Sequence, residues 1–274
     1  FFLICKKILL LQSPNIKLVF CHKMFIIQSA CTSLYYQRGS PEHNFLGLFH
    51  SRGFHVTMVH LRGHGKSGIP DGEYSIETLA HDVAHVIKTL HPNVKVHLNG
   101  LSAGFGTAMA TAILYPEVCK SLSGSGFLFD RTRCDIAAYI FSRSFVIRAL
   151  GMRNLASISR WVMRTDADLW EEMKYTKLKA FIATSQGWLK FNLTERLDEY
   201  SVPTLIMHPE YDEDLGHTKK MHEKEIGMMP KGIGELVHFQ GYSHCMHLEP
   251  GGSKLMFDTI IDFLQRREDI EFSL

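Results

Sequence analysis

The sequence has no long run of charge of one sign and no low-complexity segment. Lys and Arg together number 30 and Asp and Glu 28, which gives a formal net charge of +2. A charge balance this even provides no broad basic surface for nucleic acid or for an anionic membrane. We therefore expect no nucleic-acid partner and no obligatory membrane contact.

Closely spaced cysteine pairs are also missing. The chain has six cysteines and none forms a C-x-x-C pair. Such dispersed cysteines are typical of free thiols in a reducing compartment, and cytoplasm is the default expectation for localisation. They are Cys5, Cys21, Cys31, Cys119, Cys134 and Cys245.

The amino-terminal segment lacks a long uninterrupted apolar run. Residues 1–11 are mostly apolar, but Lys6 and Lys7 interrupt them. A signal-peptide core needs about 7–15 apolar residues, and a membrane span needs about 20. A buried strand is the preferred interpretation of residues 1–11. The sequence leaves open whether residues 1–14 belong to the folded domain.

Apolar segments of strand length recur along the chain and alternate with helical patterns. This alternation predicts an α/β fold with a mostly parallel sheet that is covered by helices on both faces. In such sheets ligands bind beyond the carboxyl ends of the strands. The expected strands are 17–21, 55–59, 95–98, 122–127, 204–207 and 235–239, and the expected helices are 76–90, 106–115 and 257–266.

One stretch, from about residue 131 to residue 200, breaks the alternation. It is rich in Arg, Met and aromatic residues and has no clear strand pattern. Some 70 residues are too many for a plain loop in a compact domain, roughly five times the usual upper length. We therefore expect a helical cap at 131–200 between two parts of one core, 1–130 and 201–274.

A candidate nucleophile lies between a predicted strand and a predicted helix. Residues 100–104 fit the pattern G-x-S-x-G around Ser102. At a strand-to-helix turn this pattern exposes the serine hydroxyl above the sheet, beside backbone N–H groups and a helix amino terminus. Positions two before and two after the serine must then be small.

Together with three further segments, the Ser102 motif resembles the α/β-hydrolase superfamily over nearly the whole chain. Residues 53–67 resemble the family's strand and Gly-x-Gly-x-Ser loop, although His60 stands where Asp is usual. Residues 202–212 resemble the strand and loop that carry the acid, and residues 241–250 resemble the histidine loop.

The resemblance implies a catalytic triad of Ser102 as nucleophile, Asp212 as orienting acid and His244 as general base. These residues follow one another in the order that the family uses. Three other carboxylates and one other histidine remain alternatives for the acid and the base. They are Glu210, Asp214, Asp130 and His247.

The oxyanion hole is expected to use the backbone N–H of Ala103 and that of Met24, with Lys23 as an alternative to Met24. The family carries His-Gly after its early strand, whereas this chain has His22-Lys23-Met24 after the strand expected at 17–21. Loss of one donor costs about 2.7–4 kcal/mol in the transition state. A weak enzyme is therefore an alternative expectation.

Two other patterns are interpreted as incidental. Residues 63–68 fit G-x-G-x-x-G, but a full phosphate loop requires glycine at position 60, where the chain has histidine. His81 and His85 are four residues apart on a predicted helix, with no evident third ligand. We expect no cofactor and no metal.

The function expected from these residues is hydrolysis of a small apolar carboxylic ester or lactone through an acyl-enzyme. Carbon–carbon bond hydrolases and lipase-like enzymes use the same triad, so the reaction subtype stays open. The alternative is a ligand-binding or receptor-like homologue with a weak or vestigial triad. The sequence does not indicate an oligomeric state.

Overall fold

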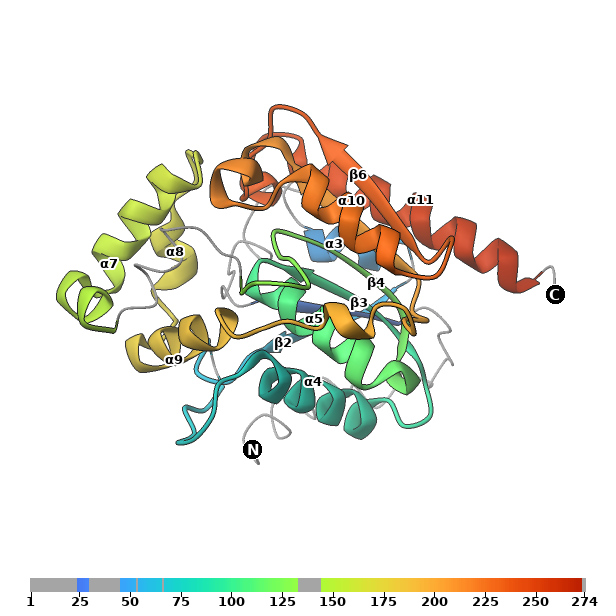
Figure 1. Ribbon diagram of the computed structural model, residues 1–274, viewed down its shortest axis with the longest axis horizontal. Helices are drawn as coiled ribbons and strands as arrows, with labels where there is room; N and C mark the ends of the chain where they lie inside the picture. The colour runs from blue at the N-terminus through green and yellow to red at the C-terminus, as the bar shows by residue number, and fades with distance from the viewer. Residues whose placement is uncertain (1–23, 30–44, 53, 66, 133–143, 273–274) are drawn as a thin grey trace.

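The fold is built on one sheet of six parallel strands in the order β2-β1-β3-β4-β5-β6 (Figure 1). The computed structural model describes residues 24–29, 45–52, 54–65, 67–132 and 144–272. The strands are β1 (Met24–Ser29), β2 (His55–His60), β3 (Val96–Leu101), β4 (Cys119–Ser125), β5 (Thr204–Pro209) and β6 (Gly234–Phe239).

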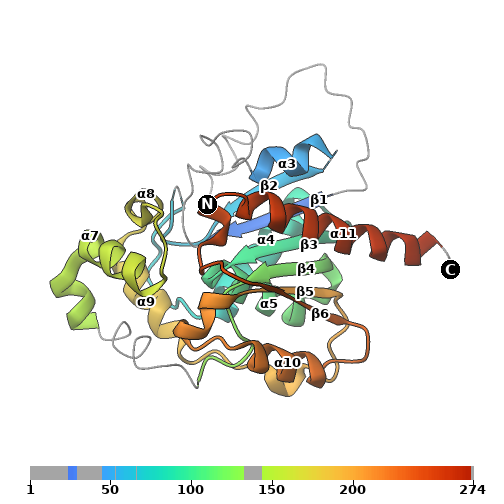
Figure 2. The same ribbon diagram turned by 90° about the horizontal axis from the view of Figure 1, so that it is seen from above.

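Helices cover both faces of this sheet (Figures 1 and 2). α4 (Ile76–Leu90), α5 (Ala103–Leu114) and α10 (Lys219–Met228) lie on one face. α3 (Phe45–Ser51) and α11 (Gly252–Phe272) pack against each other on the opposite face. The predicted α/β fold with a doubly covered parallel sheet is confirmed.

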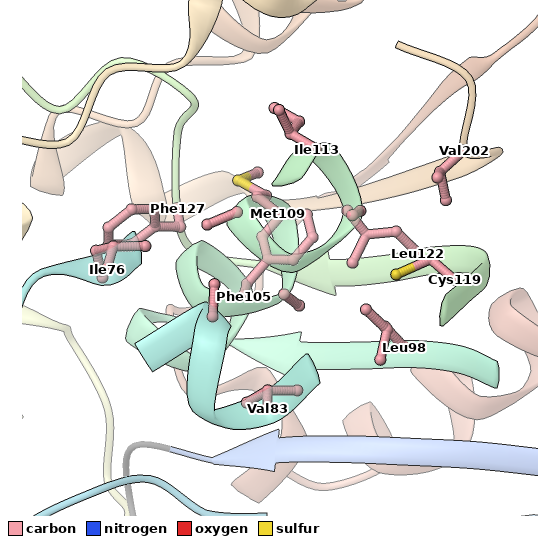
Figure 3. Packing of buried hydrophobic residues seen from close by; sticks show 14 of the residues in the cluster. Ile76, Val83, Leu98, Phe105, Met109, Ile113, Cys119, Leu122, Phe127 and Val202 are labelled. Carbon is pink, nitrogen blue, oxygen red and sulfur yellow. The ribbon is translucent and has the colours of Figure 1, made fainter. Parts of the chain in front are cut away.

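The two cores follow from the alternation of side chains along each strand. In β5, Ile206 points into the core beneath α4 and α5, while Leu205 and Met207 point into the core beneath α3 and α11. Figure 3 shows the first core, where Phe105 of α5 lies among apolar side chains of β3 and β4. Both faces of β5 therefore contact apolar cores, which explains the continuous apolar run at residues 205–207.

Helix α4 begins and ends where the sequence predicts. Its amino terminus is capped by Ser75, whose hydroxyl accepts a hydrogen bond from the Thr78 N–H at 3.2 Å. The first strand is different, since β1 covers Met24–Ser29, which had not been expected as a strand. The strands expected at 17–21 and 1–11 lie outside the described residues.

Between β4 and β5, the described residues form helices with one isolated bridge, between Asp130 and Asn192. The helices are α7 (Ser144–Val162), which Gly151 interrupts, α8 (Leu169–Met173), α9 (Leu178–Trp188) and a short 3-10 turn (Thr194–Arg196). Helices α7, α8 and α9 lie together at one end of the sheet (Figure 2). This agrees with the helical character expected for 131–200, while the domain boundaries at 130 and 200 stay a prediction.

None of the helices described here combines the length and the apolar character that crossing a bilayer requires.

Candidate active site

Ser102 occupies a tight turn between β3 and α5. Its backbone has φ 52° and ψ −126°, a left-handed conformation that non-glycine residues rarely adopt. The Ser102 N–H donates to the carbonyl of Ser125, at the end of β4, over 2.8 Å. Strained backbone of this kind persists only where the surrounding structure holds it, and it is common at functional sites.

The small residues predicted around Ser102 have a steric cause. A Cβ atom on Gly100 would lie 2.4 Å from the Gly104 carbonyl oxygen, which is closer than any real contact. The strand before the serine and the helix after it therefore touch through their backbones. This close approach explains why position 100 of the G-x-S-x-G pattern must be glycine here.

Asp212 and His244 come together at the same end of the sheet. Asp212 lies in the 3-10 turn (Glu210–Leu215) that follows β5, and His244 lies in the loop that follows β6. His244 Nδ1 donates to Asp212 Oδ1 over 2.8 Å, and Asp212 is fully buried. The Tyr211 N–H donates to the Tyr242 carbonyl at 3.1 Å, so backbone also joins the two loops.

Ser102 and His244 both lie against the end of β4. Ser102 is hydrogen-bonded to Ser125, and the next residue, Gly126, has φ +78°. A Cβ atom on Gly126 would lie 2.5 Å from His244 Cε1. The imidazole therefore occupies the space that a side chain at position 126 would fill, one residue from the partner of Ser102.

The other candidate acids have different partners. Glu210 Oε2 accepts from the Gly241 N–H at 2.7 Å, and Asp214 forms an ion pair with Arg164 at 2.9 Å. Asp130 Oδ1 accepts from both the backbone and the hydroxyl of Thr132. Of the four carboxylates weighed from the sequence, Asp212 is the one that the structure joins to His244, while its catalytic role stays a prediction.

The predicted oxyanion donor Met24 is in the wrong place. Met24 is the first residue of β1, and the register pairs Ser29, the last residue, with Leu101 beside the nucleophile. Five residues of strand separate these two ends of β1 by about 16 Å. Met24 therefore lies at the amino-terminal ends of the strands, whereas Ser102 follows their carboxyl ends. The error arose because the strand expected at 17–21 put the oxyanion loop too early in the sequence.

Ala103, the other predicted oxyanion donor, fits the local geometry. It is the first residue of α5 and is buried. The N–H groups of a first helical turn have no partner within the helix, and they point toward the region beyond the helix end. The residues after Ser29 lie outside the described residues.

Two side chains near Asp212 were missed by the sequence analysis. His217 is buried, and its Nδ1 lies 3.9 Å from Asp212 Oδ2. Arg131, which follows β4, is also buried and contacts His217 Nε2 through its guanidinium. No motif joins these residues, which are 86 positions apart, so the only signal in the sequence was the high histidine content after Asp212.

Burial and neighbouring charges set the ionisation of this group. Burial opposes ionisation of Asp212, but His244 and His217 outweigh it and hold the pKa of the carboxyl well below its usual range. Burial, together with the Arg131 charge, lowers the pKa of His217 to about 3. Asp212 is therefore a carboxylate and His217 a neutral imidazole at neutral pH.

Three groups offer one ligand atom each within 4.8 Å of one another, namely Asp212, His217 and His244. Arginine has only donors, so the nitrogen of His217 that Arg131 contacts must accept. The proton of neutral His217 is then on Nδ1, the atom that a shared metal ion would need free. The geometry disfavours a metal ion at this set of atoms.

Known proteins resemble this chain in sequence and in fold. A family model described as the alpha/beta hydrolase fold matches residues 24–127. The 2-hydroxy-6-oxo-6-(2'-aminophenyl)hexa-2,4-dienoic acid hydrolase of Metapseudomonas resinovorans is 27% identical over 239 residues, which cover 80% of this chain and 77% of that protein.

Solved structures give the same result for the fold. A carboxylesterase structure from Nitrososphaera gargenis has a TM-score of 0.72 with 18% identity, over 90% of this chain and 91% of that one. The enol-lactonase of Burkholderia xenovorans has a TM-score of 0.70 with 20% identity, over 89% and 91%. With the parallel sheet and the turn at Ser102, these matches show that the chain has the α/β-hydrolase fold.

Proposed function

We propose that the chain is a serine hydrolase that cleaves a carboxylic ester or lactone through an acyl-enzyme, with Ser102, His244 and Asp212 as its triad. The observation that carries the proposal is the position of Ser102. It stands on a strained turn at the carboxyl ends of the strands, where the hydrogen-bonded pair Asp212–His244 reaches the same β4 terminus.

The chemistry follows from the acid–base properties of the three side chains. A serine hydroxyl is a poor nucleophile at neutral pH and needs a base. His244 takes the proton as Ser102 Oγ attacks the acyl carbon, and it returns the proton to the leaving alcohol. Water then attacks the acyl-enzyme with His244 as base again, which releases the acid and restores Ser102.

Asp212 supports this cycle as a carboxylate that stays unprotonated throughout. By accepting from His244 Nδ1, it fixes the tautomer in which Nε2 is free to act as the base. Its low pKa keeps it negatively charged while the imidazolium forms. The Ala103 N–H at the start of α5 donates to the developing oxyanion, in the favourable field of the helix terminus.

An apolar substrate suits the side chains near the histidine loop. Cys245, next to His244, packs into an apolar cluster with Leu155 of α7, Met173 of α8 and Ile182 of α9. The loop after β2 also contacts α9, since Gly63 O accepts from the Lys177 N–H at 3.3 Å. In the proposed enzyme α7–α9 act as the cap over the site and contribute apolar contacts to an acyl or aryl group.

Hydrolysis of a carbon–carbon bond is a second candidate. It is favoured by the 27% identity to a protein named as the hydrolase of a 2-hydroxy-6-oxo-dienoic acid. The same serine and histidine serve both reactions, so the triad does not discriminate between them. The motive for the binding-protein alternative was Lys23 in the expected oxyanion loop. The support for that motive is weaker, because the strand register places the neighbouring residue Met24 far from Ser102.

The test is hydrolysis of a p-nitrophenyl ester series of increasing acyl length, beside a 2-hydroxy-6-oxo-dienoic acid, by wild type and by Ser102→Ala. We expect ester turnover in wild type and its loss in the variant, with a preference among acyl lengths that measures the apolar pocket. Faster turnover of the dienoic acid would favour the second candidate. Inactivity on every substrate would overturn the proposal.

A further inference from the structure

The second oxygen of the Asp212 carboxylate faces away from His244. Oδ1 takes the hydrogen bond from His244, whereas Oδ2 is buried and has no hydrogen-bond partner among the residues that the structure describes. A buried carboxylate oxygen without a donor is costly, by several kcal/mol in extreme cases. A donor near Oδ2 would therefore matter for how firmly the acid is held.

His217 is the candidate for that donor. Its Nδ1 lies 3.9 Å from Oδ2, and within the described part of the chain this nitrogen, too, has no hydrogen-bond partner. The distance exceeds a direct hydrogen bond by less than about 1 Å. A small rotation of the ring closes it, as often happens when catalytic hydrogen bonds tighten around a substrate.

Arg131 determines which nitrogen of His217 carries the proton. Its guanidinium contacts Nε2 and has only N–H donors, so Nε2 must present its lone pair. A neutral imidazole has one N–H, which is then on Nδ1 and directed at Asp212 Oδ2. The Arg131 side chain is held in turn over the Phe127 ring, 5.3 Å from its centroid.

The backbone of His217 is fixed from two sides. Its N–H donates to the Asp212 carbonyl at 3.0 Å, and its carbonyl accepts from His208 Nε2 at 2.7 Å. The His244 ring lies 6.2 Å from the His217 ring. The chain of contacts thus runs from the end of β4 to the acid and on to the base.

We propose that His217 is a positioning residue for the reaction. It holds Asp212 by donating from Nδ1 to Oδ2, and Arg131 keeps His217 in the tautomer that can do so. This inference rests on the proposed function, in which Asp212 orients His244. It assigns a role to two residues outside the triad, and neither touches the reacting atoms.

The first test needs no substrate. Nitrogen-15 NMR of histidine-labelled protein reports which ring nitrogen carries the proton, and His217→Asn identifies the signal of residue 217. We expect the Nδ1–H form in wild type at neutral pH and its loss in Arg131→Met, where the contact to Nε2 is absent. The Nε2–H form in wild type would overturn the proposal.

The second test compares two variants of residue 217. Asn has an N–H group close to the position of Nδ1, whereas Leu has the bulk but no donor. In His217→Leu we expect kcat to fall roughly tenfold to a hundredfold through misplacement of the acid, with little change in KM. His217→Asn should recover most of the activity.

The pH profile gives a readout that simple loss of packing would not move. Without the His217 donor the full charge of the Asp212 carboxylate acts on the base, so the acid limb of kcat/KM moves to higher pH in His217→Leu. The limb should stay in place in His217→Asn. Equal behaviour of the two variants would overturn the proposal while leaving ester hydrolysis by wild type intact.

If wild type hydrolyses no substrate, the proposed function fails, and the NMR signals decide the present proposal alone. Thermal unfolding of each variant verifies that it is folded, and His217→Asn substitutes for the Leu variant if the latter is not.

Discussion

At the scale of single residues, the absence of a side chain at Gly126 makes room for the His244 ring. Gly126→Ala puts a Cβ atom 2.5 Å from His244 Cε1 and must displace the ring. We expect kcat for ester hydrolysis to fall by about a hundredfold, because misplacement of a catalytic group by 1 Å has an effect of that order.

Gly232→Ala is the matched control for Gly126→Ala. Both glycines have positive φ, +83° at Gly232 and +78° at Gly126, so both variants have a similar backbone cost, roughly 1 kcal/mol. A Cβ atom at Gly232 meets nothing within 4 Å. Both variants should unfold at similarly reduced temperatures, while only Gly126→Ala loses turnover; equal turnover would contradict the geometry of the site.

What the sequence could predict at this scale depended on local context. Ser102 was found because its motif lies between a strand and a helix, and His244 and Asp212 because their loops resemble those of a known family. Arg131 and His217 were missed because their contact is made only when the ends of β4 and β5 become neighbours in the sheet. Residues that act through a partner far along the chain leave no spacing to recognise.

At the scale of elements, a helix is stabilised by the side chains that it buries against the sheet, and exposed side chains contribute little. Phe105 is fully buried between the helix and the sheet, whereas Phe145 of α7 is 69% exposed (Figure 3 shows Phe105). Phe105→Ala should lower the free energy of unfolding by about 3–5 kcal/mol. The same substitution at Phe145 should change it by no more than about 0.5 kcal/mol.

Urea unfolding of the two Phe→Ala variants measures both values. The comparison isolates burial, because the atoms removed are the same in each. A similar loss of unfolding free energy at both positions would mean that Phe145 is buried in solution, which would contradict the exposed position of its side chain on α7.

The elements themselves were predictable where sequence pattern and packing agree. Helix α4 has a capping serine and a regular apolar stripe, and its bounds matched the prediction. Strand β1 was not expected from the sequence, and its pairing with β2 and β3 is what identifies it. The strand expected at 17–21 lies outside the described residues. The predicted oxyanion donor Met24 therefore lies at the start of β1, at the end of the strands opposite to Ser102.

At the scale of the whole molecule, buried neutral histidines make stability depend on pH. The pKa of His217 is about 3 in the folded chain, compared with about 6.5 for an unperturbed histidine, and burial also lowers the pKa of His208. Between these two values the unfolded chain binds a proton at His217 that the folded chain does not. Stability therefore falls as the pH drops from about 6.5 toward 3.

The expected slope is about 1.4 kcal/mol per pH unit for each such histidine. Urea unfolding at pH 7, 6, 5 and 4.5 measures this slope. In His217→Asn the free energy of unfolding should depend less steeply on pH, by about the contribution of one histidine. Stability that stays constant from pH 7 to pH 4.5, or that rises, would contradict the buried neutral state of these rings.

The central claim is that Ser102 is an activated nucleophile, and covalent labelling tests it most directly. The protein is treated with a fluorophosphonate and analysed by intact mass and by peptide mapping, beside Ser102→Ala and His244→Ala. The account predicts a single adduct on Ser102 in wild type, none in Ser102→Ala, and much slower labelling in His244→Ala. Absence of labelling in folded wild type, or an adduct on a different residue, would contradict it.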